Sequence, residues 1–306
     1  MNKINLQNIL VVGSSNTDMV IKTEHLPRPG ETVTGGTFFM NPGGKGANQA
    51  VAIARLGGQV IFICKTGNDI FGSQSKQIFE KEGIDISYMF FDPEHPSGVA
   101  LITVDSKAEN CIAVASGSNA NLSPADLSTV REAIEKAGII LMQLEIPIET
   151  IKYVTGIARE LNKKVILNPA PAQPLDRELL QSLYLITPNE TEAEMISGIK
   201  ITDNDSLQAC AQAICDKGVQ SVIITLGSNG AFLYNETFNE HIPAVKVEAI
   251  DTTAAGDVFN GALVVALSEG CNLLEAVRFA NKAAAISVTR IGAQAAAPYR
   301  KEISEL

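Results

Sequence analysis

The stretch AGIILMQLEIPIETIKYVTGIARELNKKVILNPA, residues 137–170, determines the fold class of this chain. It opens and closes with short apolar runs, AGIILMQLE and KKVILNPA, and the residues between them have helical periodicity. A nearly continuous apolar run is typical of a strand that is buried on both faces of a parallel sheet. The stretch therefore predicts a strand–helix–strand unit.

Similar apolar runs recur along the chain, and most are followed by a helical pattern. They include NILVVGS, VIFICKTG, LYLITPNE and QSVIITLGS. Alternation of this kind predicts an α/β fold in which helices flank a mainly parallel central sheet. We find no internal repeat and no long linker, so residues 1–306 are expected to form one domain.

Two segments depart from this alternation. Residues 16–42 contain strand-like pieces with several prolines and no helical pattern, and residues 97–117 read as a hairpin that turns at DSKAEN. Both are predicted to be antiparallel excursions that pair into a small β-sheet. The residues leave two roles open, a cover over a site and a surface for dimerisation, and the two roles are compatible.

The composition excludes several classes of partner. Of 306 residues, 45% are apolar and 19% are charged, which favours a large core over disorder. The formal net charge of −10 disfavours nucleic acid and anionic membranes as partners. No apolar run approaches the roughly 18 residues of a membrane span. Because the chain enters its first strand without a cleavage-site pattern, we expect a cytoplasmic protein.

The stretch VEAIDTTAAGDVFNGAL, residues 247–263, places two carboxylates around a turn of small residues before a helix. The N–H groups of the TTAAG turn are unhindered, and a helix N-terminus favours anions. A phosphoryl group in transfer needs such donors, together with a base on the attacking hydroxyl. The turn and Asp257 could supply the two, although an acid in the first turn of a helix is also an ordinary stabilising feature.

Two further motifs suggest a site for a small polar ligand. NPGGKGANQA, residues 41–50, combines glycines that permit close backbone approach with Lys45 and Asn48 on one helical face. VVGSSNTDM, residues 11–19, ends a strand with Asn16 and Asp18, which could hold the hydroxyls of a polyol or form an Asx turn. Neither GxxxxGK[ST] nor GxGxxG is present, so a P-loop enzyme and a dinucleotide-dependent oxidoreductase are both disfavoured.

Three other motifs are ambiguous when taken alone. In LMQLEIP, Glu145 follows a strand and could cap a helix or bind a ligand. In ITPNETEAE, the spacing of Asn189 and Glu192 favours a helix cap, and a hold on a water-ligated Mg²⁺ is the functional alternative. ITLGSNGA, residues 224–231, could be no more than a hairpin turn.

Taken in order, these motifs resemble the ribokinase-like (PfkB) carbohydrate kinase family over essentially the whole chain. The strongest matches are GGKGANQA and DTTAAGD.FNGAL, and MQLE, NPAPA, ITPNETEAE, ITLGS and VTRIGAQ follow the family order. The resemblance implies phosphorylation of the 5-hydroxyl of D-ribose, with ATP as co-substrate and Mg²⁺ as cofactor. It also implies Asp257 as the catalytic base.

The resemblance assigns further positions by role. The anion hole matches Ala254, Ala255 and Gly256, where many relatives carry Gly at the position of Ala254; because the hole uses backbone N–H groups, we expect this change to be tolerated. Sugar-binding positions match Asn16, Asp18, Gly44, Lys45, Asn48, Glu145 and Asp257. Nucleotide-binding positions match Asn189, Thr225, Gly227, Ser228, Gly230, Gly256 and Asn281, and Asn189 with Glu192 matches the motif associated with Mg²⁺.

The resemblance also implies a monovalent cation, typically K⁺, beside the anion hole. Its site matches Asp251, Thr253, Ser287, Arg290, Gly292 and Ala296, mostly through carbonyl oxygens. Ala296 stands where a relative can carry Ser, which would weaken the site if a hydroxyl is needed there. The two β excursions match a lid that covers the sugar and pairs with the lid of a second copy in a homodimer.

Other functions remain open at the level of sequence. A sibling kinase would act on 2-deoxyribose, fructose or adenosine, and the absence of Trp offers few stacking platforms for a nucleobase substrate. A non-catalytic sugar-binding protein would keep the pocket, but the intact Asp257 and open turn argue against it.

Overall fold

The computed structural model describes residues 8–107 and 109–304 and contains two β-sheets. The larger has nine strands in the order β13-β12-β11-β10-β9-β8-β1-β4-β5, and its pairs are parallel except β11–β12 and β12–β13. The mainly parallel α/β fold expected from the sequence is confirmed. The strands are β1 (Asn8–Val12), β4 (Val60–Gly67), β5 (Met89–Asp92), β8 (Ala137–Gln143), β9 (Lys164–Asn168), β10 (Leu185–Ile186), β11 (Val222–Thr225), β12 (Ala231–Tyr234) and β13 (Asn239–Ile242).

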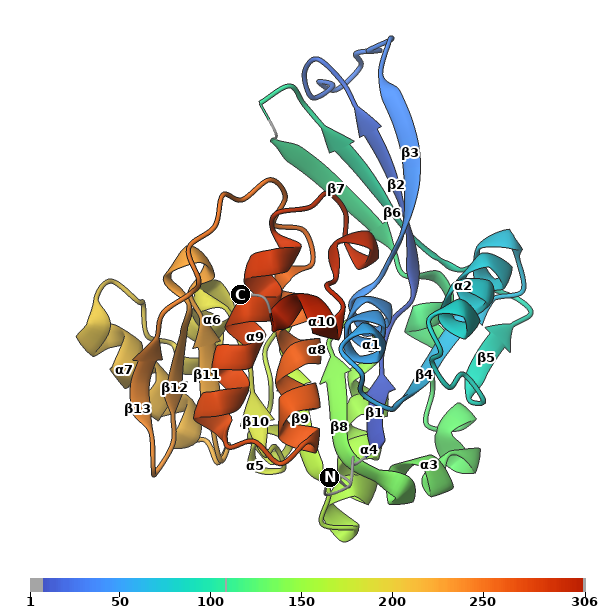
Figure 1. Cartoon of the computed structure of the whole chain (residues 1–306). Coiled ribbons are helices and arrows are strands. Elements are labelled where there is room, and N and C mark those ends of the chain that lie inside the picture. Colours follow the sequence, from blue (N-terminus) through green and yellow to red (C-terminus); the bar gives the residue numbers. More distant parts are fainter. Residues whose placement is uncertain (1–7, 108, 305–306) are drawn as a thin grey trace.

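Helices cover both faces of this sheet, as Figure 1 shows. Successive residues of β1 alternate between two apolar cores. Ile9 and Val11 belong to the core that includes residues of α1, α8 and α9, and Leu10 and Val12 belong to the core that includes residues of α3, α4 and α7. The helices are α1 (Lys45–Arg55), α2 (Ile70–Lys81), α3 (Arg131–Lys136), α4 (Ile148–Glu160), α5 (Arg177–Gln181), α6 (Glu190–Ser197), α7 (Asn204–Cys215), α8 (Ala255–Ser268), α9 (Leu273–Ser287) and α10 (Arg300–Ile303). No helix in the described ranges has the length and apolar content needed to cross a membrane.

A separate four-stranded sheet stands above one end of the main body in Figure 1. It has the order β3-β2-β6-β7 and comes from the two segments that depart from the α/β pattern. Its outer pairs are antiparallel as expected, but the central pair β2–β6 is parallel. The reason is that both strands run outward from the body, β2 directly after β1 and β6 after β5. The strands are β2 (Asn16–Lys22), β3 (Thr37–Gly43), β6 (Gly98–Val104) and β7 (Asn110–Ala115).

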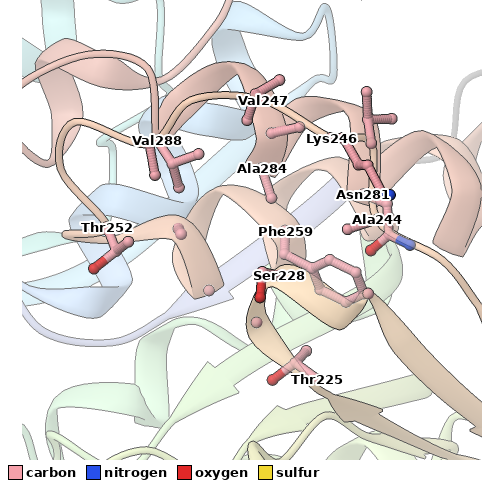
Figure 2. Close-up of a pocket in the computed structure, with 17 residues that line it drawn as sticks. Thr225, Ser228, Ala244, Lys246, Val247, Thr252, Phe259, Asn281, Ala284 and Val288 are labelled. Atoms are coloured by element: carbon pink, nitrogen blue, oxygen red, sulfur yellow. The ribbon is translucent and has the colours of Figure 1, made fainter.

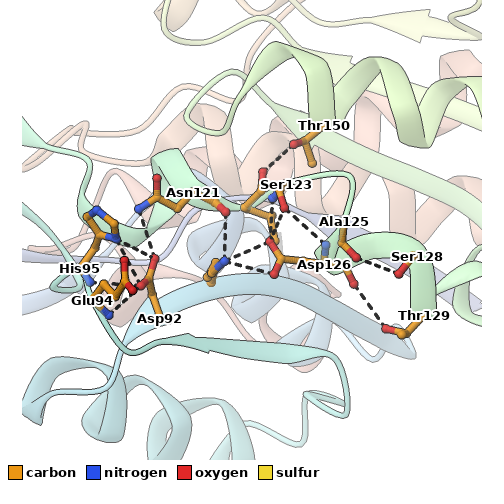
Figure 3. A network of polar contacts seen from close by, with 12 residues as sticks. Asp92, Glu94, His95, Asn121, Ser123, Ala125, Asp126, Ser128, Thr129 and Thr150 are labelled. Carbon is orange, nitrogen blue, oxygen red and sulfur yellow. Dashed lines mark hydrogen bonds and ion pairs between the residues drawn. The ribbon is translucent and has the colours of Figure 1, made fainter.

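A polar network fixes the chain between the small sheet and the body (Figure 3). Asp92, at the end of β5, accepts hydrogen bonds from the N–H groups of Glu94 and His95 and from Asn121 Nδ2 at 3.1 Å. Lys65 Nζ lies 3.1 Å from the Asp126 carboxylate. These contacts hold the short helix η1 (Gly117–Asn121) against β4, and η1 carries a side chain of the site described next.

Candidate functional site

The site begins where β1 and β8, neighbours in the sheet, reach their carboxyl ends. Ser14 Oγ donates to Glu145 Oε2 at 2.5 Å, and the N–H of Lys45 donates to the same oxygen at 3.0 Å. Glu145 therefore caps the first residue of α1, and it also joins two strand ends to that helix. Parallel sheets bind ligands in this position, at the carboxyl ends of adjacent strands.

Two glycines allow β3 and α1 to approach β2 closely. A Cβ on Gly43 would lie 2.3 Å from an Asp18 carboxylate oxygen, so the missing side chain leaves room for that carboxylate. Gly44 is the N-cap of α1 at φ 88°, and a Cβ there would lie 2.7 Å from the N atom of Asn16. Gly43 is thus required by the Asp18 side chain, and Gly44 by close contact between backbones.

Asn119 of η1 belongs to the site and was not predicted from the sequence. Its Nδ2 donates to Asn16 Oδ1 at 2.7 Å, and its Oδ1 accepts from the N–H of Ser15 at 2.9 Å. It is buried and fixes the orientation of the Asn16 amide. Asn119 and Asn16 are far apart in sequence and meet only through the fold, so the local pattern carried no signal for Asn119.

Four carboxylates surround the side chain of Lys45. Burial lowers the pKa of Lys45, but the negative charges of Asp257, Glu145, Glu192 and Asp18 outweigh it and raise that pKa overall. Burial, followed by the charges of Glu145 and Asp257, raises the pKa of Asp18 to about 6 although Lys45 lowers it. Lys45 is therefore firmly charged, whereas burial and like charges make the ionised form of Asp18 costly.

Asp257 lies in the first turn of α8 and is only 5% exposed. Asn48 Nδ2 donates to its Oδ2 at 2.9 Å, and Gln49 Nε2 donates to its Oδ1 at 3.0 Å. Burial raises the pKa of Asp257, and it outweighs the lowering effects of Lys45, Asn48 and Gln49. The neighbouring Asn48 Oδ1 is buried and has no partner among the described residues, so an acceptor is available for a ligand hydroxyl.

The turn before α8 presents free backbone donors, as the sequence predicts. The N–H groups of Ala254, Gly256 and Asp257 have no acceptor among the described residues, whereas the N–H of Ala255 donates to the Thr252 carbonyl at 3.2 Å. Ala254 is the N-cap at φ 58°, in the left-handed region. Of the three predicted anion-hole residues, Ala254 and Gly256 therefore have free N–H groups, as does Asp257, whereas the N–H of Ala255 is used within the turn.

We predict that Ala254→Gly raises the free energy of unfolding. An alanine in the left-handed region costs about 1–2 kcal/mol relative to glycine, and the greater freedom of glycine in the unfolded chain offsets part of this, which leaves a gain of about 0.5–1 kcal/mol. Chemical denaturation measures the gain. Asn162→Gly, at φ 52°, is the matched control and should gain less, because Asn tolerates this region. A destabilised Ala254→Gly variant would contradict the prediction.

A cavity of about 570 Å³ lies on the other side of this turn (Figure 2). Apolar side chains such as Phe259, Ala284 and Val288 form much of its wall, and Gly256 is also part of the lining. The cavity therefore abuts the residue that precedes Asp257. Six of the seven positions predicted to bind the nucleotide line it: Thr225, Gly227, Ser228, Gly230, Gly256 and Asn281.

The seventh position, Asn189, lies next to this cavity, at the N-cap of α6. Its side chain accepts from the N–H of Glu192 at 2.8 Å, and Glu192 Oε2 accepts from the N–H of Asn189 at 2.9 Å, which forms the capping box expected from the spacing. The chain at Asn189 also forms a parallel bridge with Thr225, a cavity residue. Glu192 Oε1 has no protein donor among the described residues.

The segment predicted to bind a monovalent cation is partly brought together. Asp251 Oδ1 accepts from the N–H of Thr253 at 2.9 Å, and Oδ2 accepts from the N–H of Gly292 at 2.8 Å. The Ser287 carbonyl accepts from the N–H of Arg290, whose side chain pairs with Glu302. Ala296 lies in the short helix η4 (Gln294–Ala296) and offers no side-chain oxygen. Within residues 8–107 and 109–304, no group of three His, Cys, Asp or Glu side chains is placed to hold a metal.

The site consists of a buried acid between a polar cluster and an apolar cavity, in an α/β fold. Sequence comparison assigns the chain to a protein family with this fold. The model of the pfkB family carbohydrate kinases matches residues 6–300. The chain therefore belongs to the pfkB family of carbohydrate kinases.

Within this family, the chain is similar to proteins named as kinases of ribose or deoxyribose. It is 45% identical to the ribokinase of Haemophilus influenzae over 297 residues, which is 97% of each chain. It is 36% identical to a deoxyribokinase of Salmonella typhi, again over 97% of each. The structure of Arabidopsis thaliana ribokinase complexed with ribose and ATP matches with a TM-score of 0.93 and 31% identity, over 98% of both chains.

Proposed function

We propose that this protein transfers the γ-phosphoryl group of ATP to the 5-hydroxyl of D-ribose, which yields ribose 5-phosphate and ADP. One observation carries the proposal. Asp257 lies buried between a cluster of hydroxyl-binding side chains and a cavity of about 570 Å³, on a helix start with free N–H groups. The similarity to ribokinases supports the choice of sugar.

The polar cluster suits a small sugar with free hydroxyls. Asp18 and Glu145 provide carboxylate acceptors, Lys45 is a donor, and Asn16 and Asn48 provide amides whose orientation the neighbouring bonds fix. The unpaired Asn48 Oδ1, next to Asp257, is an acceptor for a sugar hydroxyl. A sugar hydroxyl there would lie within reach of the Asp257 carboxylate.

Asp257 then acts as the general base. It accepts the proton of the 5-hydroxyl as the new bond forms between O5 and the γ-phosphorus, while the bond from that phosphorus to the bridging oxygen of ADP breaks. The N–H groups of Gly256 and Asp257 meet the negative charge on the phosphoryl oxygens. The apolar cavity wall holds the nucleotide with its phosphates toward this turn.

The residues at Asn189 and Glu192 fit a water-ligated Mg²⁺, because they offer oxygen atoms next to the phosphate end of the cavity. Bound there, Mg²⁺ would neutralise charge on the ATP phosphates. Asp251 and the carbonyl oxygens of the 287–296 segment are the oxygen donors that suit K⁺. A cation at Asp251 would stiffen the turn that leads to Ala254. Because the reaction consumes ATP, the cytoplasm is the compartment that we propose.

The small sheet, from residues 16–42 and 97–117, acts as a lid and as a dimer surface. Asp18 lies on one of its faces, and closure over the sugar would exclude water from the phosphoryl group. The other face carries exposed apolar side chains. Ile21, Phe38, Met40 and Leu101 share it by strand register and are 37%, 58%, 48% and 55% exposed. A second copy of this sheet would cover them in a homodimer.

We expect Leu101→Lys to convert the dimer to a monomer. The new charge would lie in the centre of the apolar face, where burying it in a dimer carries a large desolvation cost. Light scattering after size exclusion measures the mass. Met195→Lys, at a methionine on α6 that is 49% exposed, is the control and should leave the mass unchanged. A wild-type monomer, or a dimeric Leu101→Lys variant, would contradict the proposed surface.

A substrate panel tests the proposed activity. ADP release is measured with Mg-ATP and K⁺ for ribose, 2-deoxyribose, fructose and adenosine at equal low concentrations. The proposal predicts the largest kcat/KM for ribose. Preference for 2-deoxyribose, the substrate that the name of the Salmonella relative suggests, would keep Asp257 as base and reassign the sugar cluster. Sugar binding without ADP release would point to a non-catalytic sugar-binding protein.

A further inference from the structure

A continuous chain of buried polar side chains lies behind Asp257, away from the sugar cluster. Polar groups in a protein core are costly unless every partner is satisfied, and an apolar filling is often as stable. A connected set at this place therefore calls for an explanation. Its members, each at most 7% exposed, are Gln49, Gln143, Asn168, Thr187, Asn260 and Asp257.

Gln49 of α1 is the centre of this chain and is fully buried. Its Nε2 donates both to Asp257 Oδ1 at 3.0 Å and to Asn168 Oδ1 at 3.1 Å. Its Oε1 accepts from Gln143 Nε2 at 2.5 Å. A flipped Gln49 amide would turn its oxygen toward two acceptors, so the network allows one orientation, in which a donor faces Asp257.

The other branch of the chain returns to the turn that carries the free N–H groups. Asn168 Nδ2 donates to the Thr187 carbonyl at 3.3 Å, and Thr187 Oγ1 donates to Asn260 Oδ1 at 2.6 Å. Asn260 Nδ2 then donates to the Gly256 carbonyl at 2.8 Å. The same set of side chains thus contacts both the Asp257 carboxylate and the peptide of the anion-binding turn.

Close packing of α1 and α8 brings Gln49 within reach of Asp257. A Cβ on Gly261 of α8 would lie 2.7 Å from the Ala52 Cβ of α1, so the two helices touch through a glycine. Gln49 and Asn48 are consecutive on α1, about 100° apart around the helix axis, and they reach the two Asp257 oxygens from different sides. Asn48 belongs to the sugar cluster, but Gln49 faces the interior.

We infer that Gln49 is a positioning residue, which holds the Asp257 carboxylate in the orientation that accepts the sugar proton and couples it through Asn168, Thr187 and Asn260 to the Gly256 turn. The inference rests on the proposed function and adds to it a residue that does not touch the sugar or the nucleotide. Its geometric basis is the single amide orientation and the two bonds of Nε2.

The charge environment gives a second readout for this role. Lys45 on α1, Glu145 after β8, Asp18 on β2 and Glu192 on α6 act on Asp257, and only Lys45 is positive. The bond from Gln49 lowers the pKa of Asp257 against the effect of burial. Loss of that donor should therefore move the acid limb of the kcat–pH profile to higher pH.

Gln49→Met tests the inference, because methionine has a similar length and no donor. We expect kcat for ribose to fall about 10–100-fold, the factor that corresponds to one hydrogen bond to a charged group, while the KM values for ribose and ATP stay within about twofold. Gln143→Met leaves the Gln49 donor in place but removes the hydrogen bond to Gln49 Oε1 that helps to fix the amide, so a smaller loss with the same KM pattern is expected.

Thr155→Val is the control for the removal of a buried polar group. The Thr155 hydroxyl on α4 donates to the Ile151 carbonyl at 2.7 Å, away from Asp257, and its removal should change stability but not kcat or the pH profile. Thermal melts of each variant verify folding. If Gln49→Met does not fold, the kcat of Gln143→Met tests the inference instead. If the wild type is active and kcat is unchanged in both folded Gln variants, the inference about Gln49 is wrong while the proposed function stands. If the wild type phosphorylates no sugar, the proposed function is wrong, and the inference fails with it.

Discussion

Asp257→Asn is expected to lower kcat for ribose about 10²–10⁴-fold, the range typical of removing a general base. An unperturbed aspartate, with a pKa near 3.9, is a weak base for an alcohol. Burial raises the pKa of Asp257, which makes the carboxylate a better acceptor when the proton becomes acidic as the bond to phosphorus forms. The loss should appear in kcat, because the amide keeps the shape of the side chain.

The Asp257→Asn variant should fold and bind nucleotide. The new amide nitrogen at position 257 would face Asn48 Nδ2, which places two donors opposite each other. A flip of the Asn48 amide removes this conflict, because Asn48 Oδ1 has no other partner among the described residues. Calorimetric titration with ADP should give a Kd close to that of the wild type. Asp176→Asn, the same change at the N-cap of α5, is the control and should leave kcat unchanged. A loss of less than tenfold in Asp257→Asn would assign proton acceptance to another group.

Much of this fold was readable from the sequence because each strand of the main sheet is short and apolar. The run at residues 137–145 predicts β8 and its carboxyl end at Glu145, where the structure places part of the site. The parallel pairing of β2 with β6 was not readable. It depends on both strands leaving the body in the same direction, and hydrophobic alternation is the same in parallel and antiparallel pairs of a half-exposed sheet.

Site residues could be predicted from the sequence where they lie within one short motif. The glycine turn at 43–44 and the acid at Asp257 are visible in short motifs, and the capping box of Asn189 and Glu192 follows from their spacing. Asn119 and Gln49 were missed. Asn119 meets Asn16 across two chain segments, and Gln49 follows a motif residue on a different face of the helix, so the three-residue spacing that linked Lys45 to Asn48 passed over it.

Asp18→Asn should have opposite effects on stability and on sugar use. Burial and the charges of Glu145 and Asp257 raise the pKa of Asp18 to about 6, so the ionised carboxylate of the wild type destabilises the free protein near neutral pH. The neutral amide removes this repulsion, and we expect the free energy of unfolding at pH 7.5 to rise by about 1–2 kcal/mol. Urea denaturation measures the change.

The sign of the pH dependence follows from the same shift. Because the folded pKa of about 6 exceeds the ordinary aspartate value of 3.8, the folded state binds more protons between these pH values, and the stability of the wild type falls as pH rises through the interval. Asp18→Asn lacks this contribution. The difference in unfolding free energy between the two proteins should therefore grow from pH 4 to pH 6 and level off above pH 7.

The sugar KM should change in the other direction. If the ionised Asp18 accepts hydrogen bonds from ribose hydroxyls, the amide loses charged bonds worth about 1.5–3 kcal/mol each, and KM for ribose should rise about 10–10³-fold while KM for ATP is unchanged. In the wild type, KM for ribose should rise as pH falls through about 6, as Asp18 becomes protonated. This limb should be absent from Asp18→Asn.

Asp105→Asn is the matched control, because Asp105 lies in the turn of the same small sheet and accepts from the N–H groups of Lys107 and Glu109. It makes the same charge change away from the sugar cluster and should leave KM for ribose unchanged. A more stable Asp18→Asn variant with a normal KM would mean that the acidic cluster is costly without serving the sugar. A less stable variant with a raised KM would mean that Asp18 supports the lid and binds sugar only through its folding.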